Sequence, residues 1–228
     1  QNPFPAIYVY NPYTPVYRHD GDRNLILDNN GDPVFSLTNQ GLSVLEALEK
    51  NPEKEEYNRF IGSFFADYEI IEGLHAETKM AGSYSRYVRE AYTQPGSVLD
   101  GYIGDPTAPG SKQDNGDDTY DWTWLNKLSY SKSFGLNTIN ALVFNEYSEG
   151  GWHSYWLESK GYSSPLLTTQ ENSAEPEATI TRRNEYSMWS IAGQADYDFD
   201  EKYLLSASLR RDGASRFGED SKYGVFWS

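Results

Sequence analysis

Cysteine is absent from the 228 residues of this chain. Without it the chain has no disulfide framework, no thiolate ligand for zinc and no thiol nucleophile. Long apolar runs are absent too: nothing approaches the roughly 18 residues of a membrane-spanning helix. That absence excludes a transmembrane helix, but it leaves open both a soluble protein and a protein that crosses a membrane with strands.

Positive charge and histidine are scarce. There are 19 Lys and Arg against 34 Asp and Glu, so the net charge is -15, and the cations form no basic block. Nucleic acid requires a basic surface, so we expect no nucleic-acid partner. His19, His75 and His153 are far apart and form no H-E-x-x-H pair, so the sequence predicts no metal site.

Catalytic motifs are also missing. The chain has no G-x-S-x-G, no P-loop and no G-x-G-x-x-G, and its surroundings single out no pair of carboxylates. We therefore expect no catalytic residue, no cofactor and no enzyme activity.

Aromatic residues, by contrast, are abundant. They make up 15% of the chain and include 19 tyrosines, a composition that favours strands over helices. Aromatics at this density suit the interface girdles of a membrane barrel, and they equally suit a surface that stacks on sugars.

Alternation of apolar and polar residues marks three hairpins, over residues 57–87, 122–147 and 184–211. Short turns are expected at 72–73, 134–137 and 200–202, whereas long polar links occupy 89–121 and 148–183. The apolar positions predicted to face lipid are Phe64, Tyr68, Trp189, Ile191, Tyr197, Tyr203 and Leu205.

Short turns at one end and long links at the other are typical of an outer-membrane barrel, whose strands need about 9–11 residues to span. The sequence thus predicts an all-β fold, a transmembrane antiparallel β-barrel, with about six to seven strands here of a plugged barrel of about 22. Residues 1–56 are interpreted as a long ordered loop and strand excursion, with a short helix over 39–50. Residues 57–228 carry the hairpins and extracellular links, with no separate second domain. The alternative is a soluble, secreted β-rich carbohydrate-binding module.

The segment 210–218 resembles the R-x-D-G-S-S-R-F-G segment of the SusC/RagA family of TonB-dependent outer-membrane transporters, with Ala214 in place of the first serine. Segments 11–21, 59–84 and 125–134 are similar to that family in style. The matching motif residues are Arg210, Asp212, Gly213, Ser215, Arg216, Phe217 and Gly218.

The resemblance implies an importer of bulky nutrients, either oligosaccharides or peptides, in the outer membrane of a Bacteroidota-type bacterium. It implies a SusD-like surface lipoprotein that closes as a lid, and energy from TonB through a plug region that is not in this chain. It also implies contact with outer-membrane lipid and no catalysed reaction.

Two groups of residues are candidates for specific roles. Trp152, His153, Tyr155 and Trp156 are expected in the link after the second hairpin. There they either contact substrate or a partner protein, or cap the barrel rim. Arg210, Asp212 and Arg216 are expected to form a charge-paired knot around a turn at Gly213, which holds the strand end and the loop in shape.

Overall fold

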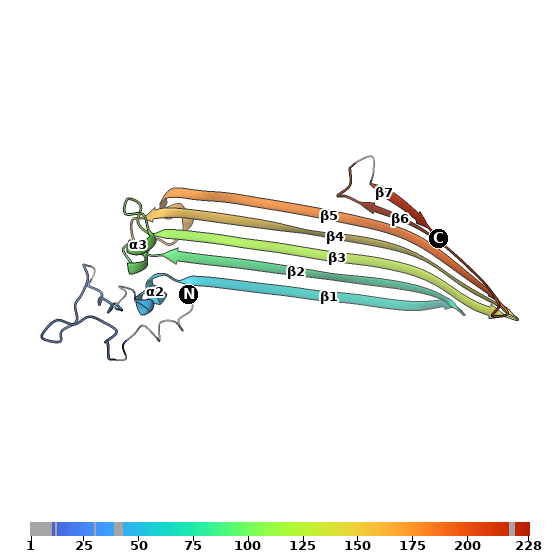
Figure 1. Ribbon diagram of the computed structural model, residues 1–228, viewed down its shortest axis with the longest axis horizontal. Coiled ribbons are helices and arrows are strands. Elements are labelled where there is room, and N and C mark those ends of the chain that lie inside the picture. The colour runs from blue at the N-terminus through green and yellow to red at the C-terminus, as the bar shows by residue number, and fades with distance from the viewer. Residues whose placement is uncertain (1–10, 12, 30, 39–42, 219–221) are drawn as a thin grey trace. The chain divides into compact units, whose positions relative to one another are not determined.

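The computed structural model describes residues 11, 13–29, 31–38, 43–218 and 222–228. Its main feature is one antiparallel sheet of seven strands, in which every strand pairs with its neighbours in sequence (Figure 1). The strands are β1 Glu53–Ile71, β2 Leu74–Thr93, β3 Ser111–Phe134, β4 Asn137–Tyr162, β5 Ser173–Phe199, β6 Tyr203–Ala214 and β7 Tyr223–Trp227. The prediction of an all-β fold with six to seven antiparallel strands in this chain is confirmed.

The three tight turns lie where the sequence predicts them. Gly73 follows β1 with a φ of 79°, and a Cβ there would lie 2.1 Å from the carbonyl oxygen of Ser131. Only glycine fits that left-handed and crowded position. At the β5–β6 turn, Asp200 and Glu201 have φ values of 56° and 55°, and Asp198 accepts a hydrogen bond from the Glu201 amide.

The long links are mostly strand, which corrects the predicted loop boundaries. β2 continues to Thr93, β3 already begins at Ser111, β4 runs on to Tyr162 and β5 starts at Ser173. The loops between them are therefore residues 94–110 and 163–172. The sequence missed these extensions because neither of their faces is consistently apolar, and such a strand shows no regular alternation. Backbone pairing needs no apolar side chain.

Helices are few and short. α2 covers Val44–Lys50, α3 covers Val98–Ile103 and the 3₁₀ turn η1 covers Gln170–Asn172. The helix expected over 39–50 thus begins at Val44, while residues 39–42 lie outside the described residues. Within the described residues, no helix has the length and apolar character needed to cross a membrane.

Contacts divide the chain into two compact units, which are described separately below. Unit 1 consists of Gln1–Glu56, Tyr87–Gly116 and Tyr155–Thr181; unit 2 consists of Tyr57–Arg86, Asp117–Ser154 and Arg182–Ser228. In unit 1, the excursion before β1 forms isolated antiparallel bridges, Tyr17 with Phe35, His19 with Leu25 and Leu27 with Pro33.

Candidate functional site

One face of unit 2, the polar face, carries hydrogen bonds and ion pairs between neighbouring strands. His75 Nδ1 lies 3.0 Å from Asp67, and Lys127 Nζ lies 2.7 Å from Glu77. Ser206 donates to Asp196 across the β5–β6 hairpin. The polar sets predicted for successive strands therefore meet on one side of the sheet, where their groups satisfy one another.

The opposite side of unit 2, the apolar face, leaves large side chains exposed. Phe64 is 62% exposed, Tyr68 70% and Leu205 69%. A pair of aromatic rings lies near each end of this face. At one end the ring centres of Trp122 and Tyr147 are 5.1 Å apart, and at the other those of Phe199 and Tyr203 are 6.3 Å apart. A soluble sheet would bury such a face against another layer.

The height of the apolar face matches a membrane. Trp189 and Phe199 are ten positions apart in β5, and they pair with Gly213 and Tyr203 in β6. At ~3.3 Å per residue this is about 33 Å of strand. A tilt of about 40° reduces it to ~25 Å, the height of the apolar band of an outer-membrane barrel.

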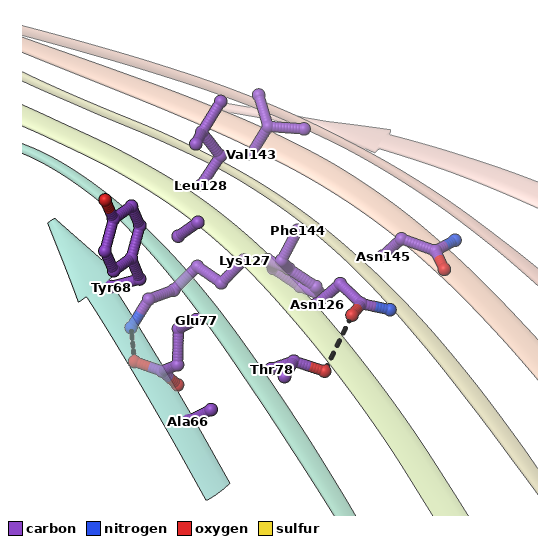
Figure 2. A pocket seen from close by; sticks show the side chains of 11 residues that line it. Ala66, Tyr68, Glu77, Thr78, Asn126, Lys127, Leu128, Val143, Phe144 and Asn145 are labelled. Carbon is purple, nitrogen blue, oxygen red and sulfur yellow. Dashed lines mark hydrogen bonds and ion pairs between the residues drawn. The ribbon is translucent and has the colours of Figure 1, made fainter. Parts of the chain in front are cut away.

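A depression of about 500 Å³ lies on the apolar face (Figure 2). Its lining contains small residues of β1 and β2, Ala66 and Ala76. Two further lining residues are bonded to each other, since Thr78 Oγ1 donates to Asn126 Oδ1 at 2.8 Å. Thr78 Oγ1 also accepts a hydrogen bond from Trp124 Nε1, which lies outside the lining. Thr78 and Asn126 bond each other in the way that polar groups in an apolar solvent must. The depression forms because small side chains stand beside large ones, and its lining offers no cluster of polar groups that point at one ligand.

The tail motif forms a smaller cluster than the sequence predicts. Arg210 Nε lies 2.8 Å from both carboxylate oxygens of Asp212, and its Nη2 donates to Ser190 Oγ at 3.4 Å. The guanidinium also lies 5.9 Å from the centre of the Phe144 ring. The expected pairing of Arg210 with Asp212 is thus present, on the polar face.

The expected turn at Gly213 is wrong, because β6 continues to Ala214 and Gly213 pairs with Trp189 on one side and Tyr223 on the other. Arg216 does not join the cluster; its guanidinium stacks on Tyr186, 4.3 Å from the ring centre.

Beyond the strand, Ser215 ties the tail to β5. Its amide donates to the Ser187 carbonyl at 2.9 Å, and its Oγ accepts from the Ser187 amide at 2.8 Å. Phe217 and Gly218 follow in the exposed turn beyond β6. The tail motif therefore contains a strand end and its anchor to the neighbouring strand.

The four aromatic candidates lie inside β4, so their expected position in a loop is wrong. Alternation along the strand places Trp152 and Trp156 on one side, and His153 and Tyr155 on the other. In unit 1, the Tyr155 ring covers Gly116, with a carbon 2.6 Å from where a Cβ would be. Trp156 is 40% exposed, and its Nε1 donates to Glu158 at 3.2 Å.

Unit 1 contains a network of buried caps that the sequence did not predict. Glu46 of α2 is 4% exposed, and its carboxylate accepts from the Val98 amide at 3.0 Å, at the start of α3. Ser97 caps α3 by accepting from the Asp100 amide at 3.1 Å. Asp100 in turn accepts from the amides of Gly96 and Gly110, both at 2.8 Å. One helix side chain thus fixes another helix, and Asp100 holds both ends of the loop.

A sequence signal for these caps does exist. Ser43 with Glu46 and Ser97 with Asp100 both match the S-x-x-[DE] spacing of a capping box. Read that way, the sequence predicts two helix starts. The spacing does not predict that the Glu46 carboxylate accepts a hydrogen bond from the Val98 amide of α3.

A lysine centre and a tyrosine pair hold the strand ends of unit 1. Lys160 Nζ lies 2.9 Å from Asp105 and 3.0 Å from Glu177. Hydrogen bonds from Thr107 and Lys160 hold the pKa of Asp105 below its usual range, and the carboxylates raise that of Lys160. Burial raises the pKa of Tyr92 to about 12; its ring meets Tyr162 edge-on at 5.5 Å.

In the described part of the chain, no three His, Cys, Asp or Glu side chains lie close enough together to hold a metal ion. The geometry instead provides a two-faced sheet in unit 2 and a strongly hydrogen-bonded set of loops in unit 1.

The sequence of this chain is similar to those of curated TonB-dependent receptors. The chain is 26% identical over 197 residues to TonB-dependent receptor SusC of Bacteroides thetaiotaomicron, a match that covers 84% of this chain and 18% of the relative. It is 24% identical over 229 residues to TonB-dependent receptor P3 of Formosa agariphila, covering 97% of this chain and 21% of the relative. The resemblance to the SusC/RagA family is confirmed.

Among solved structures, the chain is similar to the RagAB peptide transporter, with a TM-score of 0.68 and 20% identity over 87% of this chain and 22% of that chain. No family model matches the chain. The chain spans about a fifth of the length of these curated relatives. The curated relatives are named as receptors and the structural neighbour as a transporter; none is named as an enzyme.

Proposed function

We propose that this chain is the interior barrel portion of a TonB-dependent outer-membrane importer of bulky nutrients. The observation that carries the proposal is the sheet of unit 2, with an apolar face about as tall as a bilayer core and a hydrogen-bonded polar face. In the proposed protein the apolar face meets lipid and the polar face lines the wet interior. Seven strands cannot close a barrel alone, and an open edge in lipid leaves backbone groups unpaired, so further strands are required.

The cargo we propose is an oligosaccharide or a peptide, taken up together with a SusD-like lipoprotein lid and energised by TonB through a plug region. Similar proteins support this: one curated relative is TonB-dependent receptor SusC, and one similar structure is that of the RagAB peptide importer in the "closed-closed" state. A net charge of -15 favours neutral over anionic cargo, because like charges repel at the mouth of a channel.

Within this function, Trp156 and Trp152 are the proposed contacts for cargo or partner. Alternation along β4 places both on one side of the strand, while His153 and Tyr155 take the other side. The exposed indole of Trp156 is suited to stacking on a sugar ring or a peptide side chain.

The test uses the whole protein in its own cells. Deleting its gene should abolish growth on an oligosaccharide or peptide that the parent uses, and a tagged copy should fractionate with the outer membrane and co-purify a surface lipoprotein. With the barrel still assembled, Trp156→Ala should slow uptake several-fold, and His153→Ala, on the other side of β4, should not. A chain that is secreted into the medium and binds sugar there would instead favour the soluble carbohydrate-binding module.

A further inference from the structure

A row of large apolar side chains lies on the polar face of unit 2, along β1. Its members recur at every fourth position of the strand, Tyr57, Ile61 and Phe65, and we call them the inner row. Side chains an even number of positions apart share a face of a strand. Asp67, two positions beyond Phe65, pairs with His75 on the polar face, so the inner row lies on that face too.

The inner row is exposed to solvent in this chain. All three side chains are more than half exposed, with Ile61 at 72%. Arg59 and Ser63 lie between them, and the neighbouring strand β2 carries Glu77 and Lys79 on the same face. Water suits those polar groups, whereas large apolar side chains gain free energy when they leave it. An apolar partner over the face of β1 would therefore stabilise the inner row.

The position of the inner row limits what can cover it. In the proposed function lipid meets the opposite face, where Phe64 and Tyr68 lie. β1 is at one edge of the sheet. A further strand of the wall would pair with that edge, about 4.8 Å away in the plane of the sheet, and would leave the face uncovered. The partner therefore lies in the interior that the barrel strands enclose.

Two candidates occupy that interior, the plug region and passing cargo, and the inner row favours the plug region. Cargo is inside only during import, so a row that served cargo would stand in water for the rest of the time. The middle residue, Ile61, is a branched aliphatic side chain, whereas stacking on a sugar uses an aromatic ring. The chain spans about a fifth of the length of its curated relatives, so a protein of their length has ample chain for a permanent occupant.

We propose that the inner row is a permanent seat for the plug region, which stays against β1 while cargo passes on the other side of the interior. Separating the plug region from the inner row would expose large apolar side chains to water, which costs free energy in proportion to their apolar area. Separating it from a polar wall, such as β5 with Gln194 and Asp196, exchanges hydrogen bonds within the protein for hydrogen bonds with water at little net cost. The proposal rests on the proposed function, because it needs both a plug region and cargo.

The experiment uses a photoreactive side chain in the whole protein, in its own cells. After irradiation, Ile61→benzoylphenylalanine should form a covalent link to the plug region of the same polypeptide, which peptide mass spectrometry locates. Import of a fluorescently labelled oligosaccharide or peptide that the parent uses should continue, because the linked surfaces need not separate. The matched control is Phe64→benzoylphenylalanine, on the apolar face of the same strand, which should form no link to the plug region.

Three outcomes of this experiment would overturn the proposal. Loss of import on linking at position 61, with import by the irradiated Phe64 control unchanged, would show that the plug region must leave β1. A link from position 61 to the labelled cargo would assign the inner row to the cargo path. Absence of any link from position 61 to the plug region would remove the seat. Absence of the wild-type protein from the outer membrane would instead refute the proposed function, which is a separate readout.

A second measurement weakens the seat itself. In planar bilayers with added urea, the double variant Ile61→Gln, Phe65→Gln should open an ion-conducting channel about tenfold more often than the wild type, because the plug region loses apolar contacts. The matched control is Met188→Gln with Leu204→Gln, which removes two scattered, exposed apolar side chains from the polar face of β5 and β6 and should leave channel opening unchanged. Equal opening by the two double variants would contradict a seat on β1. Heat-modifiable migration on gels shows that each barrel is folded.

Discussion

The two units of this chain share strands but differ in which side chains they expose and which they bury. Unit 2 exposes large apolar side chains on one face, such as Phe64 at 62% and Tyr68 at 70%, and has few buried residues. Unit 1 buries charged and polar groups instead, with Glu46 at 4% and Asp100 at 8% exposed, and satisfies them with backbone amides.

The difference shows what stabilises each region. In unit 2 the proposed lipid supplies the apolar environment, so the sheet needs no second layer, and each strand must be apolar on one side only. In unit 1 the described loops are held by side chains that cap backbone groups. Charged substitutions should therefore be costly on the apolar face of unit 2, and lost caps should be costly in unit 1.

The largest expected effect is from a charge in the middle of the apolar face. Val143→Arg should lower the free energy of unfolding of the whole protein in lipid vesicles by about 2–4 kcal/mol, the cost of an arginine near the bilayer midplane. Val143 is 53% exposed on that face, so no neighbour needs to be displaced. Urea titration followed by tryptophan fluorescence measures the change.

The control is Gln194→Arg, which adds the same charge on the polar face beside Asp196. It should change the free energy of unfolding by less than about 1 kcal/mol, as exposed ion pairs do. Equal destabilisation by the two variants would show that the apolar face does not meet lipid, and the contrast between the units would fail.

An intermediate effect is expected from a lost cap in unit 1. Glu46→Ala removes the acceptor of the Val98 amide, which sits 3.0 Å from the carboxylate, and should cost about 1–3 kcal/mol of local stability. Hydrogen exchange of the amides in 94–110 measures that loss. The matched control is Glu49→Ala, at an exposed position of the same helix, which should leave exchange unchanged. Unchanged protection of Val98 in the Glu46 variant would mean that the loop is ordered without its caps.

The smallest effect concerns pH. Asp105 has a lowered pKa, mainly through its hydrogen bonds with Thr107, so its contribution to stability is present above about pH 4 and is lost as the pH falls further. Lys160 has a raised pKa, so its contribution is present below about pH 10 and is lost as the pH rises above that value. Amide exchange around residues 105–108, corrected for its intrinsic pH dependence, should thus show constant protection from about pH 5 to 9.

Lys160→Met should weaken that protection in the plateau itself, because it removes the partner of Asp105 and Glu177. Protection that already declines between pH 6 and 8 would contradict the role of this ion pair.

Much of unit 2 could be predicted from the sequence. Alternation such as Trp189, Ser190, Ile191 identifies a strand and its two faces, and a register shift of one residue would place every apolar side chain on the wrong side. The turns could be predicted as well, since Glu72 and Gly73 have the residue types that a two-residue hairpin loop needs. The pairing of Arg210 with Asp212 follows from their spacing, because residues two apart share a face.

The strand extensions and the tail after β6 could not be predicted by the same reasoning. The β4 extension through Trp152 and Trp156 mixes aromatic and polar residues on both faces, so nothing in its pattern separates strand from loop. Arg216 was expected beside Asp212 on charge alone, yet it stacks on Tyr186, because the chain leaves the strand at Ala214 and turns toward β5.

The sequence by itself determined the fold class, the three hairpins and the face on which each side chain of unit 2 lies, because a period of two is a local property of the chain. Only the tertiary structure decided how far the polar strands continue, that Glu46 caps a helix about fifty residues away, and that the Arg211 guanidinium stacks on the Tyr223 ring. Those features depend on which segments distant in sequence come together, and that is settled by strand pairing and backbone hydrogen bonding, which residue types alone do not encode.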